Sequence, residues 1–374
     1  MNTRHLHEIF QKYIDNFEYI NNSENDENYK WEIAEAFQSF DLYAKDFSKE
    51  LSRLCKISAN LIDSGYGLPF NGLVEYAKYD QETVRKMFID LYEDDNGDLS
   101  AKQRKINAFI ESSEILRKKY APDSHLYVNN QRSAMQFLFL KDPDHNYMYK
   151  AVQAKSFADC VEFYEDWGPM SDFRIEVFYR MCDLLVEEIK KYPELVATHQ
   201  SRYEKSKKPL HEDNELHILA FDIIYSSQVY NFYSGMNITS INAQARKLHE
   251  ERVAKAKHYH EVLTKAQEEN DKLRSANEYL KETFSVGTKI CHRFFKEGII
   301  TETNDQQWIT VDFNGSEKKL NLATLIVSGS ILIDDESVKA KTDEYKAVLK
   351  NSLIIPQALV RAEKDFSEYE EYYI

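Results

Sequence analysis

Apolar side chains recur at helical spacing through most of the first 233 residues. One stripe extends from Ile9 to Ile20, and a longer stripe extends from Trp31 to Leu54. Apolar residues three or four positions apart lie on one face of a helix, and that face packs against a core. The pattern therefore predicts a mainly helical N-terminal domain.

Between His125 and Lys155 the helical spacing is lost. Short runs such as HLYV and NYMYKAV alternate as strands do, and the pair Asp142-Pro143 is typical of a turn between them. We therefore expect a small sheet inserted in the helical domain.

Capping residues predict where two helices begin. Asp80, followed by Glu82, is a candidate N-cap, and Ser100 with Gln103 has the spacing of a capping box. Asp80 and Ser100 are therefore each expected at the start of a helix.

Residues 240–284 contain neither glycine nor proline and carry charges of both signs, which predicts one long helix. Numbered as heptads, the segment gives a seam that improves from Tyr259 onward. In a coiled-coil homodimer this seam would contain Leu263, Asn270, Leu273, Asn277 and Leu280. Asparagine in a seam fixes the register of a dimer, but the same pattern suits a helix that packs on its own domain. Both arrangements remain open.

A strand pattern replaces the helical pattern after Val286. The strand-like runs are separated by turn signals such as Asn314-Gly315. They lie at residues 289–293, 298–302, 308–313 and 318–322. Strands of this length can close into a five-stranded SH3-like barrel.

These patterns together predict an α+β fold that is mainly helical. The expected segments are N-terminal helices at 1–60, a mixed α+β recognition domain at 61–235, a long helix at 240–284, a small β-barrel at 285–335, and a C-terminal helix with an acidic tail at 336–374.

Composition supports helices and limits the partners. The chain has 25 Tyr and 21 Phe but only 10 Gly and 7 Pro, which favours helices over loops. A formal net charge of −15 argues against general adhesion to nucleic acid or an anionic membrane, so any nucleic-acid contact has to be local. Without a membrane-helix run or a signal-peptide pattern, we expect a cytoplasmic protein with no membrane contact. The four cysteines form no CxxC pair and are expected to be reduced and buried.

Motifs of known catalytic or metal chemistry are missing from the sequence. It contains no GxxxxGK[ST] loop, no GxGxxG and no HExxH, and His258 and His260 point to different faces of a helix. Aligning Gly97 with the sixth position of a calcium loop puts Tyr92 and Gln103 where Asp and Glu are needed. We therefore expect no metal, no cofactor and no catalytic residue, and favour a binding protein over an enzyme.

One group of basic and aromatic residues could contact nucleic acid. It consists of Arg132, Tyr147, Tyr149, Lys150 and Lys155. The cations could hold phosphates, and the tyrosine rings could stack on a base. The alternative is that the tyrosines are half-buried strand residues and the cations are solvated, and it is left open.

The strand region also carries a family pattern, over less than a fifth of the chain. Its residues are Gly287, Ile290, His292, Phe295 and Gly298, followed by ITVDFNGSEKKL. This order resembles the Tudor-like module at the C-terminus of UvrD and PcrA helicases, although Lys296 replaces the first glycine of the Phe-Gly pair. The resemblance implies docking to protein or nucleic acid without chemistry. The docking residues it suggests are His292, Phe294, Phe295 and Trp308.

A second pattern spans roughly residues 60–233. It consists of Arg104, Phe109, Arg132, Ser133, Ala134, Pro143, Asp144, Tyr147, Tyr149, Lys150, His217, Leu219, Asp222, Ile224 and Tyr225. The order resembles the N-terminal module of McrB-like restriction ATPases and related phage-defence proteins. The ATPase that usually follows is replaced here by the long helix and the strand region.

The resemblances imply a non-catalytic recognition or adaptor subunit of a bacterial nucleic-acid-associated, restriction-like anti-phage defence system. Such a subunit would bind DNA or RNA, or a partner ATPase, helicase or nuclease, and could form a homodimer through the long helix. The alternatives are a nuclease or other effector with an unrecognised active site in residues 60–233, and a structural scaffold.

Overall fold

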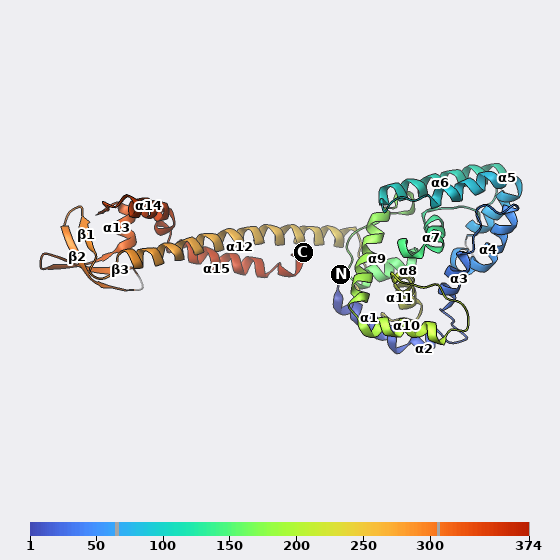
Figure 1. The fold of residues 1–374 in the computed structure, drawn as a ribbon, viewed down its shortest axis with the longest axis horizontal. Helices are drawn as coiled ribbons and strands as arrows, with labels where there is room; N and C mark the ends of the chain where they lie inside the picture. Colours follow the sequence, from blue (N-terminus) through green and yellow to red (C-terminus); the bar gives the residue numbers. More distant parts are fainter. Residues whose placement is uncertain (64–66, 305–306, 374) are drawn as a thin grey trace. The chain divides into compact units, whose positions relative to one another are not determined.

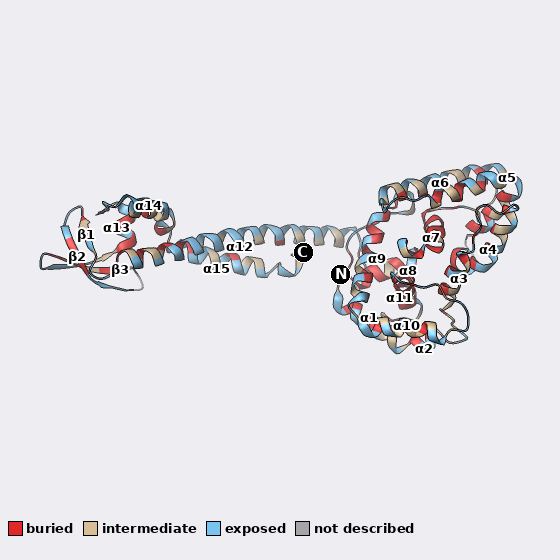
Figure 2. Cartoon of the chain, viewed as in Figure 1, coloured by how far each residue is buried: buried red, intermediate tan, exposed pale blue. Residues whose placement is uncertain are grey.

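A computed structural model of the chain describes residues 1–63, 67–304 and 307–373. Contacts divide the chain into unit 1, Met1–Ala243, and unit 2, Gln244–Ile374. Each unit has its own buried core (Figures 1 and 2).

Unit 1 is built from helices. They are α1 (Thr3–Asp15), α2 (Phe17–Ile20), α3 (Tyr29–Phe37), α4 (Phe47–Ile62), α5 (Pro69–Tyr92), α6 (Leu99–Tyr120), α7 (Gln131–Lys141), α8 (Ala151–Cys160), α9 (Ile175–Lys190), α10 (Pro193–Lys205) and α11 (His217–Val229), with short 3-10 helices η1 (Pro143–His145) and η2 (Met170–Asp172). The described residues of unit 1 form no strand, so the expected inserted sheet is wrong.

The segment expected to form that sheet instead contains α7, η1 and the start of α8, with an extended stretch at residues 146–150. Side chains satisfy backbone groups of this stretch. Gln136 Nε2 donates to Tyr149 O at 3.3 Å, and the Tyr147 N–H donates to Tyr179 Oη at 3.4 Å. These side chains take the place of the neighbouring strand that a sheet would require.

The two expected helix starts have different outcomes. Asp80 is confirmed as a cap, because its Oδ1 accepts the N–H of Thr83 at 3.2 Å where α5 kinks. The capping box at Ser100 is wrong. Asp98 is the N-cap of α6, and its Oδ1 accepts the Ser100 N–H at 2.8 Å. The carboxylate two positions earlier therefore satisfies the donor.

A buried ionic network lies at the centre of unit 1. The Asp222 carboxylate, on α11, pairs with Lys30 of α3 and lies 3.5 Å from Arg202 of α10. The Tyr13 hydroxyl of α1 donates to it as well. Burial alone would raise the pKa of Asp222, but the charges of Lys30 and Arg202 hold that pKa below its ordinary value. The network therefore fixes helices that are far apart in the sequence.

Removing this buried anion should destabilise unit 1. For Asp222→Asn we expect the free energy of unfolding to fall by about 3–5 kcal/mol, because Lys30 and Arg202 would stay buried without their counter-ion. Urea denaturation followed by circular dichroism measures the change. Asp90→Asn, which removes the exposed partner of Lys86, is the control and should cost less than about 0.5 kcal/mol. Equal stability of D222N and wild type would contradict this role.

Unit 2 contains the long helix and the sheet. Its elements are α12 (Ala243–Thr283), which begins at the unit boundary, β1 (Lys289–His292), β2 (Lys296–Thr303), β3 (Trp308–Phe313), β4 (Ser316–Asn321), α13 (Leu322–Ser328), β5 (Ile331–Leu332), α14 (Glu336–Lys350), α15 (Ile354–Ser367) and the 3-10 helix η3 (Glu370–Tyr372). The antiparallel sheet has the order β4-β3-β2-β1-β5 and is open, so closure into an SH3-like barrel is not confirmed. The α+β class and the mainly helical content are confirmed.

The inner face of the sheet carries the small core of unit 2. Ile309, Val311 and Phe313 alternate inward along β3, and Ile300 lies opposite Val311. At Gly298 a Cβ would lie 2.6 Å from the Phe313 ring, so glycine is required for this strand to approach. The alternating apolar residues of the predicted strands are therefore the residues that form the buried core on the inner face of the sheet.

The predicted dimer seam of α12 is filled by the same chain, which was one of the two open arrangements. Helix α15 and η3 return antiparallel along α12 (Figure 1). The His260 ring stacks on Tyr373 at 4.1 Å, and Tyr259 stacks on Tyr369 at 5.4 Å.

The remaining seam positions are accounted for within unit 2. Leu273 and Leu280 are buried in its core, and the side chain of Asn277 accepts from Gln307. Leu263 and Asn270 are half-buried. A homodimer through this seam would have to displace α15, so the seam is corrected to an intramolecular one.

All four cysteines are free thiols. Burial raises the pKa of the Cys55 and Cys160 thiols to about 12 and raises that of Cys182 well above its ordinary value. Cys291 is half-buried, so the expectation of buried thiols holds for the other three. Among the described helices, none is long and apolar enough to cross a membrane.

Candidate functional site

The two tyrosines of the predicted nucleic-acid cluster are core residues. Tyr147 and Tyr149 are each 3% exposed. The Tyr147 ring stacks on His217 at 4.0 Å, and its hydroxyl donates to Asp183 at 2.7 Å. The Tyr149 hydroxyl accepts from Trp167 Nε1 at 3.2 Å. Neither ring offers a face to solvent, so their assignment as base-stacking residues is corrected to core packing.

The three cations of that cluster are divided. Lys155 pairs with Asp159, one turn further along α8, and donates to the carbonyl oxygen of Ile241. Arg132 and Lys150 remain together, because Gln136, one turn after Arg132 on α7, bonds to the carbonyl that precedes Lys150. Lys155 is therefore a structural cation, and the other two form a separate group.

Arg132 and Lys150 have no carboxylate partner among the described residues. Within residues 1–63, 67–304 and 307–373, the Lys150 ammonium donates only to the carbonyl oxygen of Leu61, and Arg132 Nε is buried without an acceptor. Burial, together with the charges of Arg132 and Lys30, lowers the pKa of Lys150 to about 8. This part of unit 1 therefore carries positive charge that the described residues do not neutralise.

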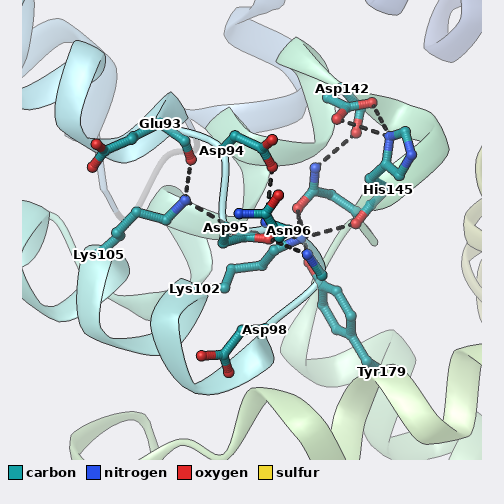
Figure 3. Close-up of polar contacts among 12 residues, drawn as sticks. Glu93, Asp94, Asp95, Asn96, Asp98, Lys102, Lys105, Asp142, His145 and Tyr179 are labelled. Atoms are coloured by element: carbon teal, nitrogen blue, oxygen red, sulfur yellow. Dashed lines mark hydrogen bonds and ion pairs between the residues drawn. The ribbon is translucent and has the colours of Figure 1, made fainter.

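A polar pocket of about 610 Å³ lies where the α5–α6 loop meets η1, α9 and α11. Figure 3 shows the polar contacts of Lys102, Lys105 and Tyr179, which line it. The buried Lys102 ammonium donates to His145 O at 3.0 Å and to Asn146 Oδ1 at 2.8 Å. Lys105 pairs with Asp95 at 3.0 Å. Burial lowers the pKa of Lys102, which the charge of Asp95 partly opposes. The acidic loop that resembles a calcium loop thus supplies, through Asp95, the counter-ion of Lys105 and a negative charge close to Lys102.

His217 also lines this pocket and is oriented by the backbone. Its Nδ1 lies 2.9 Å from Pro143 O and 3.0 Å from Asn146 O, so Nδ1 carries the proton and donates. Burial lowers the pKa of His217, which favours the neutral imidazole with a lone pair on Nε2. Such a ring can accept a proton or a hydrogen bond. In the part of the chain that the structure describes, no group of His, Cys, Asp and Glu side chains could hold a metal ion.

The sequence did not assign Lys102, Asp95 or His217 to a site. Of these, His217 belonged to the second family pattern, and Asp95 lay in the rejected calcium loop. A buried lysine has no local sequence signal, because its burial depends on residues 43 and 44 positions away.

The four predicted docking residues of unit 2 do not form one surface, because they differ in burial and lie at different places on the sheet. His292 is buried, and its Nδ1 accepts the N–H groups of Phe294 and Phe295 at 3.1 and 3.3 Å. Phe294 is 76% exposed, and Phe295 stacks on His292 at 4.7 Å. Trp308 is exposed but lies at the other end of β3 from Phe313, which Phe295 contacts. His292 therefore shapes a turn that presents the phenylalanines.

Cations surround the exposed phenylalanines. Lys318 Nζ lies 6.0 Å from the centre of the Phe295 ring. We name this surface the aromatic tip; its residues are Arg293, Phe294, Phe295, Lys296 and Lys318. All five are exposed, and none of its cations forms an ion pair with any described residue. Lys296, which stands where the Tudor-like pattern has glycine, adopts the left-handed φ of 65° that glycine favours.

Comparisons with protein-family models, with curated proteins and with solved structures found no match to this chain.

The buried charge of Lys150 gives a pH-dependent prediction. Because its folded pKa of about 8 lies below the unfolded value of 10.5, the unfolded chain binds more protons between these values, and wild-type stability rises with pH there. Lys150→Met removes this dependence. Relative to wild type, the variant should therefore lose about 2 kcal/mol of unfolding free energy between pH 8 and 10.

Urea denaturation at several pH values measures that difference. At pH 7 we expect K150M to equal or exceed wild type in stability, since the desolvated charge is gone. Lys155→Met, which removes a cation paired with Asp159, is the control. If the difference in unfolding free energy between K150M and wild type stays constant with pH, Lys150 is not desolvated in the folded protein.

Proposed function

We propose that this chain is a recognition or adaptor protein that contacts nucleic acid through the aromatic tip of unit 2. The observation that carries the proposal is the exposure of Phe294 beside cations that form no ion pair with any described residue. Aromatic faces stack on bases of any sequence, and unpaired cations attract phosphates. On a chain of net charge −15, such a surface gives the local contact that nucleic acid requires.

Single-stranded nucleic acid fits this surface better than a duplex. Its bases are free to stack on Phe294 and Phe295, whereas the bases of a duplex are already stacked on one another. The wider role, as a non-catalytic subunit of a bacterial anti-phage system that serves an ATPase, helicase or nuclease, rests on the two family resemblances. A protein partner docking on the same aromatic tip is the competing outcome.

Substitutions in the tip test the proposal. Phe294→Ala should weaken binding of single-stranded DNA or RNA by about 1–3 kcal/mol through the lost stacking. The double variant Arg293→Glu with Lys296→Glu should weaken it sharply and reduce its salt dependence by about one unit of slope for each lost phosphate contact. Fluorescence anisotropy at several salt concentrations measures both effects.

The control for charge is Lys257→Glu with Lys265→Glu, which changes the net charge equally on exposed positions of α12. It should bind as wild type does, apart from a small long-range effect at low salt. If the wild type binds neither single-stranded DNA nor RNA at low salt, the proposal is overturned and protein docking takes its place.

A second candidate is the effector with an active site in residues 60–233. The polar pocket favours it, because a neutral, backbone-oriented His217 faces the same cavity as Lys102. Degradation of DNA or RNA that His217→Ala abolishes and Phe294→Ala leaves intact would favour this candidate. Binding without turnover would favour the adaptor.

A further inference from the structure

Strand β5 forms one edge of the sheet of unit 2, in the order β4-β3-β2-β1-β5. The Arg293 N–H donates to Ser330 O at 2.8 Å, and Leu332 also pairs with β1. Backbone groups of an antiparallel strand alternate in direction, so those of Ile331 and Ile333 point away from β1. In the part of the chain that the structure describes, neither the N–H nor the C=O group of Ile331 or Ile333 forms a hydrogen bond. The edge therefore offers two donors and two acceptors to another strand.

Two cavities adjoin this edge. Residues 331–334 line both of them, and their volumes are about 730 and 370 Å³. The larger cavity is also lined by β1 and β2, and exposed Ile299 and Leu332 contribute apolar surface to it. The smaller cavity is lined by β5 together with α13 and α14. Because both cavities include the edge residues, the edge is open to an extended segment.

The larger cavity is acidic. Glu297, Asp312 and Asp334 line it, and none of the three forms an ion pair with a described residue. Asp335 lines it as well, and Lys289 is the one cation among its described lining residues. Carboxylates without counter-ions beside an open edge favour a strand that carries cations. They disfavour a second copy of β5, because its own Asp334 and Asp335 would bring like charges to the edge.

The smaller cavity has a different chemistry. The buried side chains of Ile326 and Ile331 line it. Its two lysines are already neutralised, since Lys346 pairs with Asp343 and Lys339 lies 4.0 Å from a carboxylate of Glu336. Successive side chains of a strand point to opposite faces of a sheet. A segment that alternates apolar and cationic residues therefore matches the two cavities.

We propose that the open edge of β5 binds an extended segment of a partner protein, in which apolar residues alternate with lysine or arginine. The segment adds to the five-stranded sheet through hydrogen bonds to Ile331 and Ile333. Its apolar side chains pack against Ile326 and Ile331, and its cations face the carboxylates of the larger cavity. This docking goes beyond the nucleic-acid contact proposed for the aromatic tip and does not require it.

A blocked peptide of alternating lysine and valine tests the site on the full-length protein, by isothermal titration calorimetry at low salt. We expect saturable binding that weakens as salt is added, and no binding of a matched peptide of alternating glutamate and valine. Hydrogen–deuterium exchange gives the position. The bound peptide should slow exchange of the Ile331 and Ile333 amides and leave that of Leu332, which faces β1, unchanged.

Variants separate the backbone from the charges. Ile333→Pro removes an outward N–H without breaking a bond to β1, so the unit should fold and bind the peptide at least about fivefold more weakly. Ile333→Val keeps the N–H and is its control. Asp334→Lys should weaken binding at low salt, whereas Glu268→Lys, the same charge change on an exposed position of α12, should not. Circular dichroism checks that each variant is folded.

Four results would each overturn the proposal. They are a wild type that does not bind the lysine–valine peptide, equal binding of the glutamate–valine peptide, binding without slower exchange at Ile331 and Ile333, and binding to D334K or folded I333P as tight as to wild type. A wild-type dimer that I333P dissociates would assign the edge to a second copy and would overturn it too. Phe294→Ala should leave peptide binding unchanged, so failure of this site is distinguishable from failure of the aromatic tip.

Discussion

The buried carboxylate of Asp222 is the interaction on which unit 1 depends. It neutralises Lys30 and Arg202, and all three side chains are withdrawn from water. Arg202 in turn lies 3.7 Å above the Trp31 ring, so the ionic network is continuous with the aromatic core. Breaking a buried pair leaves an unpaired charge that the helices cannot expose without separating. The packing of α1, α3, α10 and α11 therefore follows from one charge.

The same network determines which cations of unit 1 have no carboxylate partner among the described residues. Helix α11, which Asp222 anchors, begins at His217 and so brings that imidazole to the polar pocket. Because Asp222 and Glu27 neutralise Lys30, neither is available to Arg132 and Lys150. The uncompensated cations beside α8 are thus a consequence of how the core is charged, and they are placed by the fold instead of by a local motif.

In unit 2, a residue that packs in the core and the residues proposed for recognition lie within a few positions of one another. His292 turns its Nδ1 toward the two backbone N–H groups that follow, which closes the turn and leaves Phe294 outside the core. The α12 seam is covered by α15, so the apolar surface exposed at the tip is not needed to hold the unit together. Mutations at the tip can therefore change binding with little effect on folding.

Residue spacing by itself determined most helices of unit 1 but not α7, and it determined the long helix and the first four strands of unit 2, because periodicity fixes which face of an element is apolar. Spacing also identified the seam of α12 but not its partner, which is a helix about one hundred residues later. It misassigned Tyr147 and Tyr149, since an aromatic residue in an extended segment looks the same whether it faces water or Asp183. Only the tertiary structure decided which cations keep a counter-ion. Burial and pairing depend on residues distant in sequence, as between Lys30 and Asp222, and no local pattern encodes such contacts.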